Sequence, residues 1–269
     1  MTDISIVIVS YNTADLTLEC IKSVDFACKD IDSEILVIDN ASKDDSVKLL
    51  KKLKLENTSL VIIKNSENLG FSKAVNIGIK KSTGQYTFLL NPDTKVNKGS
   101  IKKLLDFTKE QKNAGLIAPQ LVLPDGTVQK SVMHFPTLKN AIKEFWMGEK
   151  NAYSLYIPKG KKPIKVDYVV AAALLITPAA RQKVGLFDES YFMYFEDFDY
   201  CKRVKQSGLD TYYLPLVKVI HHHGASGENI RSKDNQWRRL IPSSKIYHGL
   251  VKHHLINFVI WSGQKIRNN

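Results

Sequence analysis

The chain has 269 residues, of which 43% are hydrophobic and 25% charged, and this composition excludes a disordered, collagenous or low-complexity protein. Its length suits one large domain, or one domain with a smaller appendage. Because Lys and Arg number 39 against 27 Asp and Glu, the net charge is +12, which predicts affinity for nucleic acid, an acidic membrane surface or a phosphate-rich substrate.

The first residues indicate a strand rather than a targeting segment. The apolar stretch at 4–9 has no basic segment before it, unlike a signal peptide. The late apolar run at 258–261 is far shorter than the ~20 residues that a bilayer span needs. The three cysteines form no CxxC pair, so neither a disulfide framework nor a zinc site is indicated. We therefore expect a cytoplasmic protein that can also lie peripherally on the inner face of the cell membrane.

Apolar strands alternate with amphipathic helices in the first half of the chain. The expected strands are 4–9, 35–38, 60–63, 86–90 and 116–118, and the expected helices are 15–24, 44–55, 71–81 and 99–112. This alternation is typical of βαβ units, so it predicts a doubly wound α/β fold with a parallel sheet. In such folds ligands bind beyond the carboxyl ends of the strands.

The second half is less regular. We expect a hairpin turn at 124–126, strands at 166–176 and 211–221, and helices at 138–146, from 178, and at 196–206. Residues 241–269 have helical spacing with a basic face. The predicted division is one domain over 1–240, with halves at 1–120 and 121–240, followed by a basic amphipathic helical tail over 241–269.

Polar residues follow the strands where a nucleotide would bind. They are Ser10, Tyr11 and Asn12 after the first strand, Asp39 and Asn40 after the second, and Asn68, Gly70 and Phe71 at the start of a helix. The chain has no GxGxxG or GxxxxGK[ST] motif, which argues against a dinucleotide or P-loop site. Asp39 alone fits two interpretations: it hydrogen bonds to a nucleotide, or it finishes a turn at a helix cap.

Asn91 and Asp93 end another apolar strand in a polar turn. A carboxylate there can hold Mg²⁺ or Mn²⁺, which bridges phosphate oxygens, although a lone Asn-Pro-Asp also suits an ordinary turn. His221 follows a late strand in a run of three histidines. Strand alternation puts at most two of them on one face, as metal ligands or as a surface cluster without a metal.

Carboxylates open the helix expected at 196–206, directly after aromatic residues. Glu196, Asp197 and Asp199 all lie in its first turn. A partly desolvated carboxyl among aromatic rings has a raised pKa, which suits a general base. Acidic residues also favour first turns for the helix dipole alone, so both interpretations stay open.

Together these motifs resemble the inverting, GT-A type family 2 glycosyltransferases, and most closely their rhamnosyltransferase-like branch. The resemblance covers roughly residues 4–255 and rests on the order of its motifs. They are Ser-Ile-Val-Ile-Val-Ser-Tyr-Asn (5–12), Val-Ile-Asp-Asn-Ala-Ser (37–42), Asn-Leu-Gly-Phe-Ser-Lys-Ala-Val-Asn (68–76), Leu-Leu-Asn-Pro-Asp (89–93), Gly-Leu-Phe-Asp-Glu through Tyr-Phe-Glu-Asp-Phe-Asp (185–199) and His-His-His-Gly-Ala-Ser (221–226).

The resemblance implies a GT-A fold, with a Rossmann-like, mostly parallel sheet between helices and a C-terminal acceptor-side extension. It assigns Asp197 as the catalytic base beside Glu196, and Asp93 and His221 to a Mn²⁺ or Mg²⁺ ion. A nucleotide-diphospho-sugar would contact Ser10, Tyr11, Asn12, Asp39, Asn40, Asn68, Gly70, Phe71 and Asn91. The sequence departs from the family pattern at Asn91, which leaves one carboxylate in the DxD-like motif, and at Ala171–Ala173, where many relatives have a glycine.

The implied activity is transfer of rhamnose or a hexose, from dTDP-rhamnose or a UDP-sugar, to a glycan or polyprenyl-linked acceptor in cell-surface polysaccharide synthesis. An anionic membrane surface is an expected partner, and nucleic acid is not. Two alternatives stay open from the residues: a sugar nucleotidyltransferase, although Ser10–Leu16 contains no Gly, Lys or Arg, and a basic nucleic-acid-binding protein.

Overall fold

The computed structural model describes residues 2–222 and 233–268. Its strands are β1 (Ile4–Ser10), β2 (Ser33–Asp39), β3 (Ser59–Lys64), β4 (Tyr86–Leu90), β5 (Thr94–Val96), β6 (Ala114–Val122), β7 (Val132–Met133), β8 (Ile164–Val166), β9 (Tyr168–Val169), β10 (Ala173–Ile176) and β11 (Asp210–His221). Its helices are α1 (Ala14–Ala27), α2 (Ser46–Leu50), α3 (Phe71–Lys81), α4 (Ser100–Glu110), α5 (Leu138–Phe145), α6 (Pro178–Val184), α7 (Glu196–Gln206), α8 (Lys233–His248) and α9 (Leu250–Asn268).

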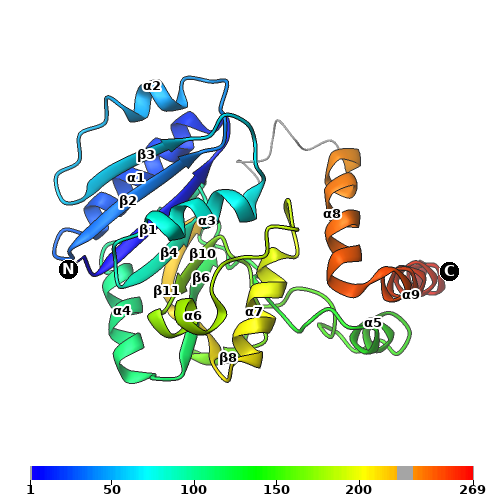
Figure 1. Ribbon diagram of the computed structural model, residues 1–269. Coiled ribbons are helices and arrows are strands. Elements are labelled where there is room, and N and C mark those ends of the chain that lie inside the picture. Colours follow the sequence, from blue (N-terminus) through cyan, green and yellow to red (C-terminus); the bar gives the residue numbers. More distant parts are fainter. Residues whose placement is uncertain (1, 223–232, 269) are drawn as a thin grey trace.

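One large sheet runs through the centre of the molecule (Figure 1), in the order β3-β2-β1-β4-β10-β6-β11-β5, with β8 also paired to β11. The pairs β1–β2, β1–β4, β2–β3 and β6–β11 are parallel, whereas β10 lies antiparallel between β4 and β6. The predicted doubly wound, mostly parallel sheet is therefore confirmed. A small second sheet pairs β7 with β9.

Helices cover both faces of the large sheet because side chains alternate along each strand. Ile4, Ile6 and Ile8 of β1 pack with residues of α1, α2 and α4. Val7, between them, faces the opposite way and packs with residues of α3, α6 and α7. Strands β1, β2, β4 and β6 are thus buried on both faces, as their nearly continuous apolar sequences indicate, whereas the edge strand β3 is partly exposed.

The single strand expected over 166–176 is wrong. The chain there forms β8, β9 and β10, and a turn at Ala171–Ala172 separates the last two. β9 pairs with β7 of the small sheet, whereas β10 pairs with β4 and β6 of the large one. Hydrophobic periodicity missed this change of sheet because both alanines of the turn are buried like strand residues.

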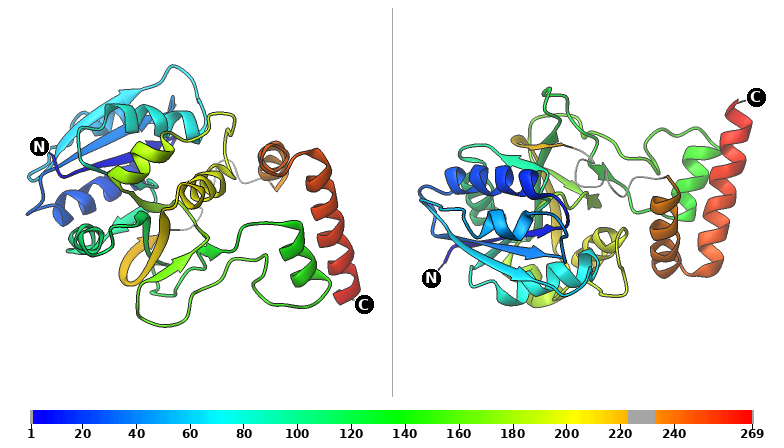
Figure 2. Two further views of the ribbon diagram at one scale, coloured as in Figure 1. Left: turned by 60° about the horizontal axis from the view of Figure 1, so that its bottom comes forward. Right: turned by 90° about the horizontal axis from the view of Figure 1, so that it is seen from above.

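The helices α5, α8 and α9 form a lobe beside the sheet (Figure 2). Ala141 of α5 packs with Ile256 and Val259 of α9. Helix α8 begins at Lys233, so the expected boundary between residues 240 and 241 falls inside a helix. In the described part of the chain, no helix is both long and apolar enough to cross a membrane.

Candidate active site

The carboxyl ends of the parallel strands meet at one edge of the sheet. Ser10 at the end of β1 lies beside Asp39 at the end of β2, and the Asn40 backbone N–H donates to the Ser10 carbonyl (2.8 Å). The Ser10 hydroxyl is buried and lies 3.1 and 3.0 Å from the hydroxyls of Thr13 and Thr17. Ser10 therefore anchors the start of α1 to the strand end.

Asp39 is fully buried at this edge. Its Oδ2 accepts a hydrogen bond from the Ser42 backbone N–H (3.1 Å), whereas Oδ1 accepts none from the described residues. Since a buried carboxylate oxygen without a donor is costly, Oδ1 is suited to a donor group on a ligand. The two interpretations of Asp39 are therefore compatible, because one oxygen caps the turn and the other accepts no hydrogen bond from the described residues.

Asn12 ties the loop after β1 to the loop after β2. Its backbone N–H donates to the Ser42 hydroxyl (2.9 Å), and its side-chain oxygen accepts from the Lys43 N–H (2.7 Å). Asn12 has the left-handed φ of 55° that asparagine tolerates. These contacts fix the backbone on the C-terminal side of the half-buried Tyr11.

Asn40 joins the second and third strand ends. Its buried side chain donates to the Asn68 side-chain oxygen (2.9 Å) and the Gly70 carbonyl (3.2 Å), and accepts from the Asn65 side chain (3.0 Å) and the Leu69 N–H (3.0 Å). With its donors and its acceptor directed at the protein, Asn40 positions the loop before α3. Asn68 completes that loop by accepting from the Gly70 N–H (3.0 Å).

Gly70 brings the loop before α3 against the loop before α7. It has a φ of 81°, and a Cβ built on it would lie 2.5 Å from the Phe192 carbonyl oxygen. The next residue, the half-buried Phe71, donates its N–H to that same oxygen (2.7 Å). Only glycine fits here, because both the backbone angle and the close approach exclude a side chain.

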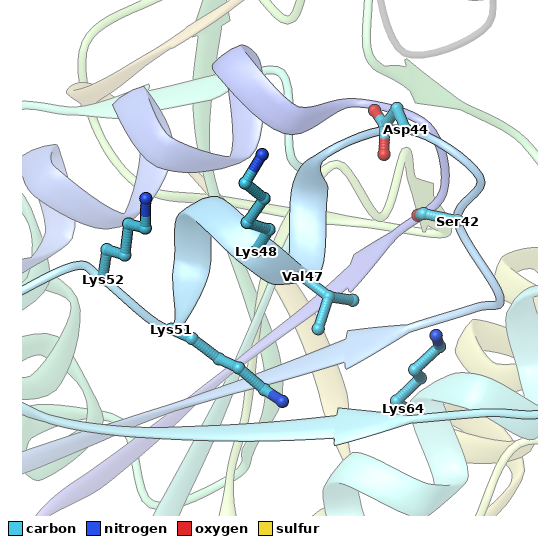
Figure 3. A pocket seen from close by; sticks show the side chains of 7 residues that line it. All are labelled: Ser42, Asp44, Val47, Lys48, Lys51, Lys52 and Lys64. Carbon is cyan, nitrogen blue, oxygen red and sulfur yellow. The ribbon is translucent and has the colours of Figure 1, made fainter.

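A lysine-lined cavity of about 530 Å³ lies next to Ser42, between α2 and β3 (Figure 3). Its lining residues are Ser42, Asp44, Val47, Lys48, Lys51, Lys52 and Lys64. None of Asp39, Asp93 and Asp197 is among them. The four lysine ammonium groups make the surface around this cavity electropositive, and a positive surface attracts anions.

Asp93 and His221 lie together on neighbouring strand ends. Their nearest side-chain atoms, His221 Nε2 and Asp93 Oδ1, are 3.4 Å apart, and both residues are buried. The other ring nitrogen, Nδ1, lies 2.8 Å from Gln129 Oε1. The His222 N–H donates to the Asp93 carbonyl (2.8 Å), while His223 lies outside the described residues.

The turn that carries Asp93 is held by the turn at Ala171–Ala172. The Asn91 N–H donates to the Ala172 carbonyl (2.9 Å), and the Asn91 carbonyl accepts from the Thr94 hydroxyl (2.7 Å). Burial raises the pKa of the Asp197 carboxyl, and the Ala171 backbone N–H is one of the groups that oppose this rise. One two-residue turn therefore contacts the Asp93 turn on one side and Asp197 on the other.

Asp197, at the start of α7, accepts two hydrogen bonds. The Tyr168 hydroxyl donates to Oδ2 (2.7 Å), and the Phe198 N–H donates to Oδ1 (3.0 Å). The Tyr168 ring stacks on Phe198 at 3.6 Å between centroids, which fixes the hydroxyl. Burial raises the pKa of the Asp197 carboxyl, and these donors oppose that rise because they favour the charged form.

Glu196, beside it, has no comparable donors. Its side chain is buried, and its Oε2 has no hydrogen-bond partner among the described residues. Burial and the neighbouring Asp197 charge raise the pKa of Glu196 well above its usual range. Because Asp197 accepts hydrogen bonds from Tyr168 and Phe198 whereas Glu196 Oε2 accepts none from the described residues, Asp197 is better stabilised than Glu196 as a charged carboxylate. Asp199, in contrast, pairs with Arg203 (2.7 Å).

The backbone before α7 is strained. Tyr194 and Phe195 have left-handed φ values of 70° and 66°, which bulky residues rarely adopt. Helix α8 holds this segment, since the Ser243 hydroxyl donates to the Met193 carbonyl (2.8 Å) and Tyr247 lies 5.4 Å from the Phe195 ring. Such strain persists only where the surrounding structure over-determines it, which is typical of active sites.

The family model of glycosyl transferase family 2 matches residues 5–168, more than half of the chain. The chain belongs to glycosyl transferase family 2. Among curated relatives of this family 2 enzyme, the "N-acetylglucosaminyl-diphospho-decaprenol L-rhamnosyltransferase" of Mycobacterium tuberculosis (strain ATCC 25618 / H37Rv) is 29% identical over 211 residues, 71% of this chain and 67% of the relative. The "dTDP-rhamnosyl transferase RfbF" of Shigella flexneri is 25% identical over 227 residues, 83% of this chain and 70% of that protein.

A solved structure confirms the GT-A fold of this glycosyltransferase. The crystal structure of GalNAc-T7 with UDP, GalNAc and Mn²⁺ matches with a TM-score of 0.64 at 17% sequence identity. The match covers 82% of this chain and 44% of that one. Family and fold therefore favour the glycosyltransferase over the two alternatives, a sugar nucleotidyltransferase and a nucleic-acid-binding protein.

Sequence motifs did not identify three residues of the candidate site. Tyr168 lies 29 positions from Asp197, and Gln129 lies 92 positions from His221. Phe192 meets Gly70 through its backbone carbonyl, which leaves no mark on side-chain identity. The aromatic residues at 191–195 indicated that this segment is part of the site, but they did not predict the contacts of Tyr168, Gln129 and Phe192.

Proposed function

We propose that this family 2 enzyme transfers rhamnose or a hexose from a nucleotide-diphospho-sugar to an acceptor hydroxyl, with inversion at the anomeric carbon. The observation that carries the proposal is the place of the Ala171–Ala172 turn: the Ala172 carbonyl accepts from the Asn91 N–H, and the Ala171 N–H favours the charged form of Asp197. This turn thus lies between a carboxylate suited to a cation that neutralises the donor diphosphate and a carboxylate suited to an acceptor hydroxyl. Two carboxylates in separate roles are what a single-displacement transfer needs.

The donor's nucleotide is assigned to the end of β1 and β2. Asp39 Oδ1 is a buried acceptor suited to an N–H or O–H group of a nucleoside. Tyr11 and Asn12 flank it, and the lysines beside Ser42 attract the charged donor. The Shigella relative is named for dTDP-rhamnose and the GalNAc-T7 structure holds UDP, so dTDP-rhamnose and UDP-sugars are the donors to test.

The chemistry of Asp93 and His221 fits a divalent cation. A carboxylate oxygen and an imidazole nitrogen 3.4 Å apart can both bind Mn²⁺, and donor phosphate oxygens complete such sites. Gln129, next to Nδ1, orients the imidazole so that Nε2 faces Asp93. Mn²⁺ or Mg²⁺ bound there supplies positive charge that stabilises the leaving diphosphate. The GalNAc-T7 structure contains Mn²⁺, which supports the same choice.

Asp197 is assigned as the general base. It takes the proton from the acceptor hydroxyl as that oxygen attacks the anomeric carbon, and the bond from this carbon to the diphosphate oxygen breaks on the opposite side. Glu196 keeps its proton and adds no second negative charge beside the acceptor. Because one displacement completes the transfer, no covalent intermediate with the enzyme forms and the anomeric centre is inverted.

The acceptor is assigned to the second half of the chain. We propose that residues 1–120 bind the donor, that 121–240 bind the acceptor and carry the base, and that 241–269 form a basic tail. The mycobacterial relative is named for a decaprenol-linked acceptor, which supports a glycan or polyprenyl-linked acceptor in cell-surface polysaccharide synthesis. Such an acceptor would draw a cytoplasmic enzyme to the inner face of the cell membrane.

The test is the Asp197→Asn variant, which keeps the shape of the side chain and removes its basicity. We expect transfer from the sugar nucleotide to fall at least ~100-fold, as loss of a general base does, while nucleoside diphosphate binding stays within a factor of about two. The matched control is Asp106→Asn on α4, where the carboxylate is exposed and pairs only with Lys102 and Lys109. Full activity of Asp197→Asn would remove Asp197 from this role.

A further inference from the structure

Exposed apolar side chains gather on the lobe formed by α5, α8 and α9. Of the fifteen large apolar side chains that are exposed in the described part of the chain, ten lie on this lobe: Trp146, Met147, Leu240, Ile246, Leu250, Val251, Leu255, Phe258, Trp261 and Ile266. Single exposed apolar residues are normal, but a contiguous set marks an interaction surface.

Helix α9 has apolar residues on two opposite sides. One side packs on α5 through Ile256 and Val259, and Gly263 permits a close approach, since a Cβ there would lie 2.5 Å from the Phe145 carbonyl oxygen. On the other side, Val251, Leu255 and Phe258 follow the i, i+4, i+7 spacing of one helix face and are 72%, 45% and 54% exposed. Packing within the lobe therefore explains one side of α9, whereas the other side remains largely exposed and meets only the partly exposed Trp146 among the described residues.

The charge of this helix favours one kind of partner. Residues 241–269 include three lysines and one arginine, and no aspartate or glutamate. The Lys265 ammonium lies 4.5 Å from the centroid of the exposed Trp261 ring, and Trp146 approaches Phe258 at 6.5 Å. Aromatic rings with lysines around them suit the headgroup region of an anionic bilayer, whereas a second copy would bring like charges together.

We propose that the exposed side of α9, with Trp146 beside it, docks on the surface of an anionic phospholipid bilayer. We call this surface the α9 face and define it by Trp146, Val251, Leu255, Phe258 and Trp261. The apolar side chains enter the headgroup and acyl boundary, while Lys265, which lies over the Trp261 ring, binds a lipid phosphate. In this arrangement, no helix of the described residues crosses the bilayer.

The docked lobe contacts the segment that precedes the proposed base. Helix α8 precedes α9 and contacts the segment before α7, through the Ser243 hydroxyl on Met193 and the Tyr247 ring on Phe195. A bilayer under α9 is therefore linked through α8 to the segment before α7, the helix whose second residue is Asp197. This step rests on the proposed function, since it gives a lipid-linked acceptor a short path from the bilayer to the base.

The experiment measures vesicle binding of the full chain without substrates, so its result does not depend on the transfer reaction. Vesicles contain either neutral phosphatidylcholine alone or about one third phosphatidylglycerol. We expect wild-type protein to sediment with the anionic vesicles at least about tenfold more strongly than with neutral ones, and less so as salt rises. Equal binding to both vesicles, or binding to neither, would overturn the proposal.

Two variants of the α9 face test the apolar and charged parts separately. We expect Phe258→Ser with Trp261→Ser, and separately Lys265→Glu, each to weaken anionic vesicle binding about tenfold or more. The control, Phe26→Ser with Leu216→Ser, removes two exposed apolar side chains from elsewhere and leaves binding unchanged. Folding is checked by circular dichroism.

Oligomeric state separates a bilayer partner from a second copy. Sedimentation velocity of the wild type and of the Phe258→Ser, Trp261→Ser variant should give the same monomer mass. A wild-type dimer that the variant dissociates would assign the α9 face to self-association and overturn the bilayer proposal. The wild type and the variant should transfer sugar to a water-soluble acceptor at equal rates, because neither substitution touches the proposed active site.

Discussion

Replacing Tyr168 by phenylalanine tests how the structure sets the protonation of the proposed base. The change deletes one hydroxyl, which donates to Asp197 Oδ2 at 2.7 Å, and keeps the ring that stacks on Phe198. Burial and the neighbouring carboxylates hold the pKa of Tyr168 well above its usual range, so the hydroxyl remains a donor throughout the pH range of activity. Its loss removes support for the charged form of Asp197 and moves the pKa of Asp197 further upward.

The size of the effect follows from the strength of this hydrogen bond. A hydrogen bond to a charged group contributes about 1.5–3 kcal/mol, and 1.36 kcal/mol corresponds to a factor of ten. At acidic pH the ionised fraction of Asp197, and with it kcat/KM, should therefore fall by about 10- to 100-fold. At alkaline pH, where Asp197 is ionised in both proteins, the variant should approach the wild-type rate.

The assay is the pH dependence of kcat/KM for transfer from the sugar nucleotide. The matched control is Tyr200→Phe, which deletes a buried hydroxyl that donates to the Gly185 carbonyl (3.0 Å) and does not touch Asp197. The control should lower stability without moving the acidic side of the profile. If Tyr168→Phe leaves that side unmoved, or lowers the rate equally at every pH, the hydrogen bond does not govern the base.

Two further predictions concern Glu196 and the metal ligands. Burial raises the pKa of Glu196 in the folded state, so its contribution to stability is complete below the unfolded-state pKa and is lost as pH rises through the folded-state pKa. Glu196→Gln should therefore raise Tm more at about pH 8 than at about pH 5. An equal change in Tm at the two pH values would contradict the burial argument. EDTA should lower the transfer rate at least ~10-fold, and Mn²⁺ or Mg²⁺ should restore it. The His221→Ala variant should need a higher Mn²⁺ concentration to reach the same rate. A transfer rate that EDTA does not change would exclude a metal at Asp93.

Local pattern was sufficient for the repeating part of the fold. The apolar stretch at 4–9 and its counterparts predicted the parallel strands β1 to β4 and β6, because a strand buried on both faces must be apolar throughout. The polar residues that end β1 and β2 were expected at one edge, and Asp39 and Ser10 do lie side by side there. Motif order also identified the family, which the family match confirms.

Residue patterns along the chain were thus enough to predict the fold class, the family and the edge of the sheet at which the candidate site lies. The folded structure was needed to show that β10 inserts antiparallel between β4 and β6, that the Ala171–Ala172 turn lies between the Asp93 turn and Asp197, and that Tyr168 contacts Asp197 and Gln129 contacts His221. The physical reason is the range of the interactions. Strand and helix periodicity arise from neighbours a few residues apart, whereas the protonation of Asp197 and the orientation of His221 depend on groups that meet only after the chain has folded.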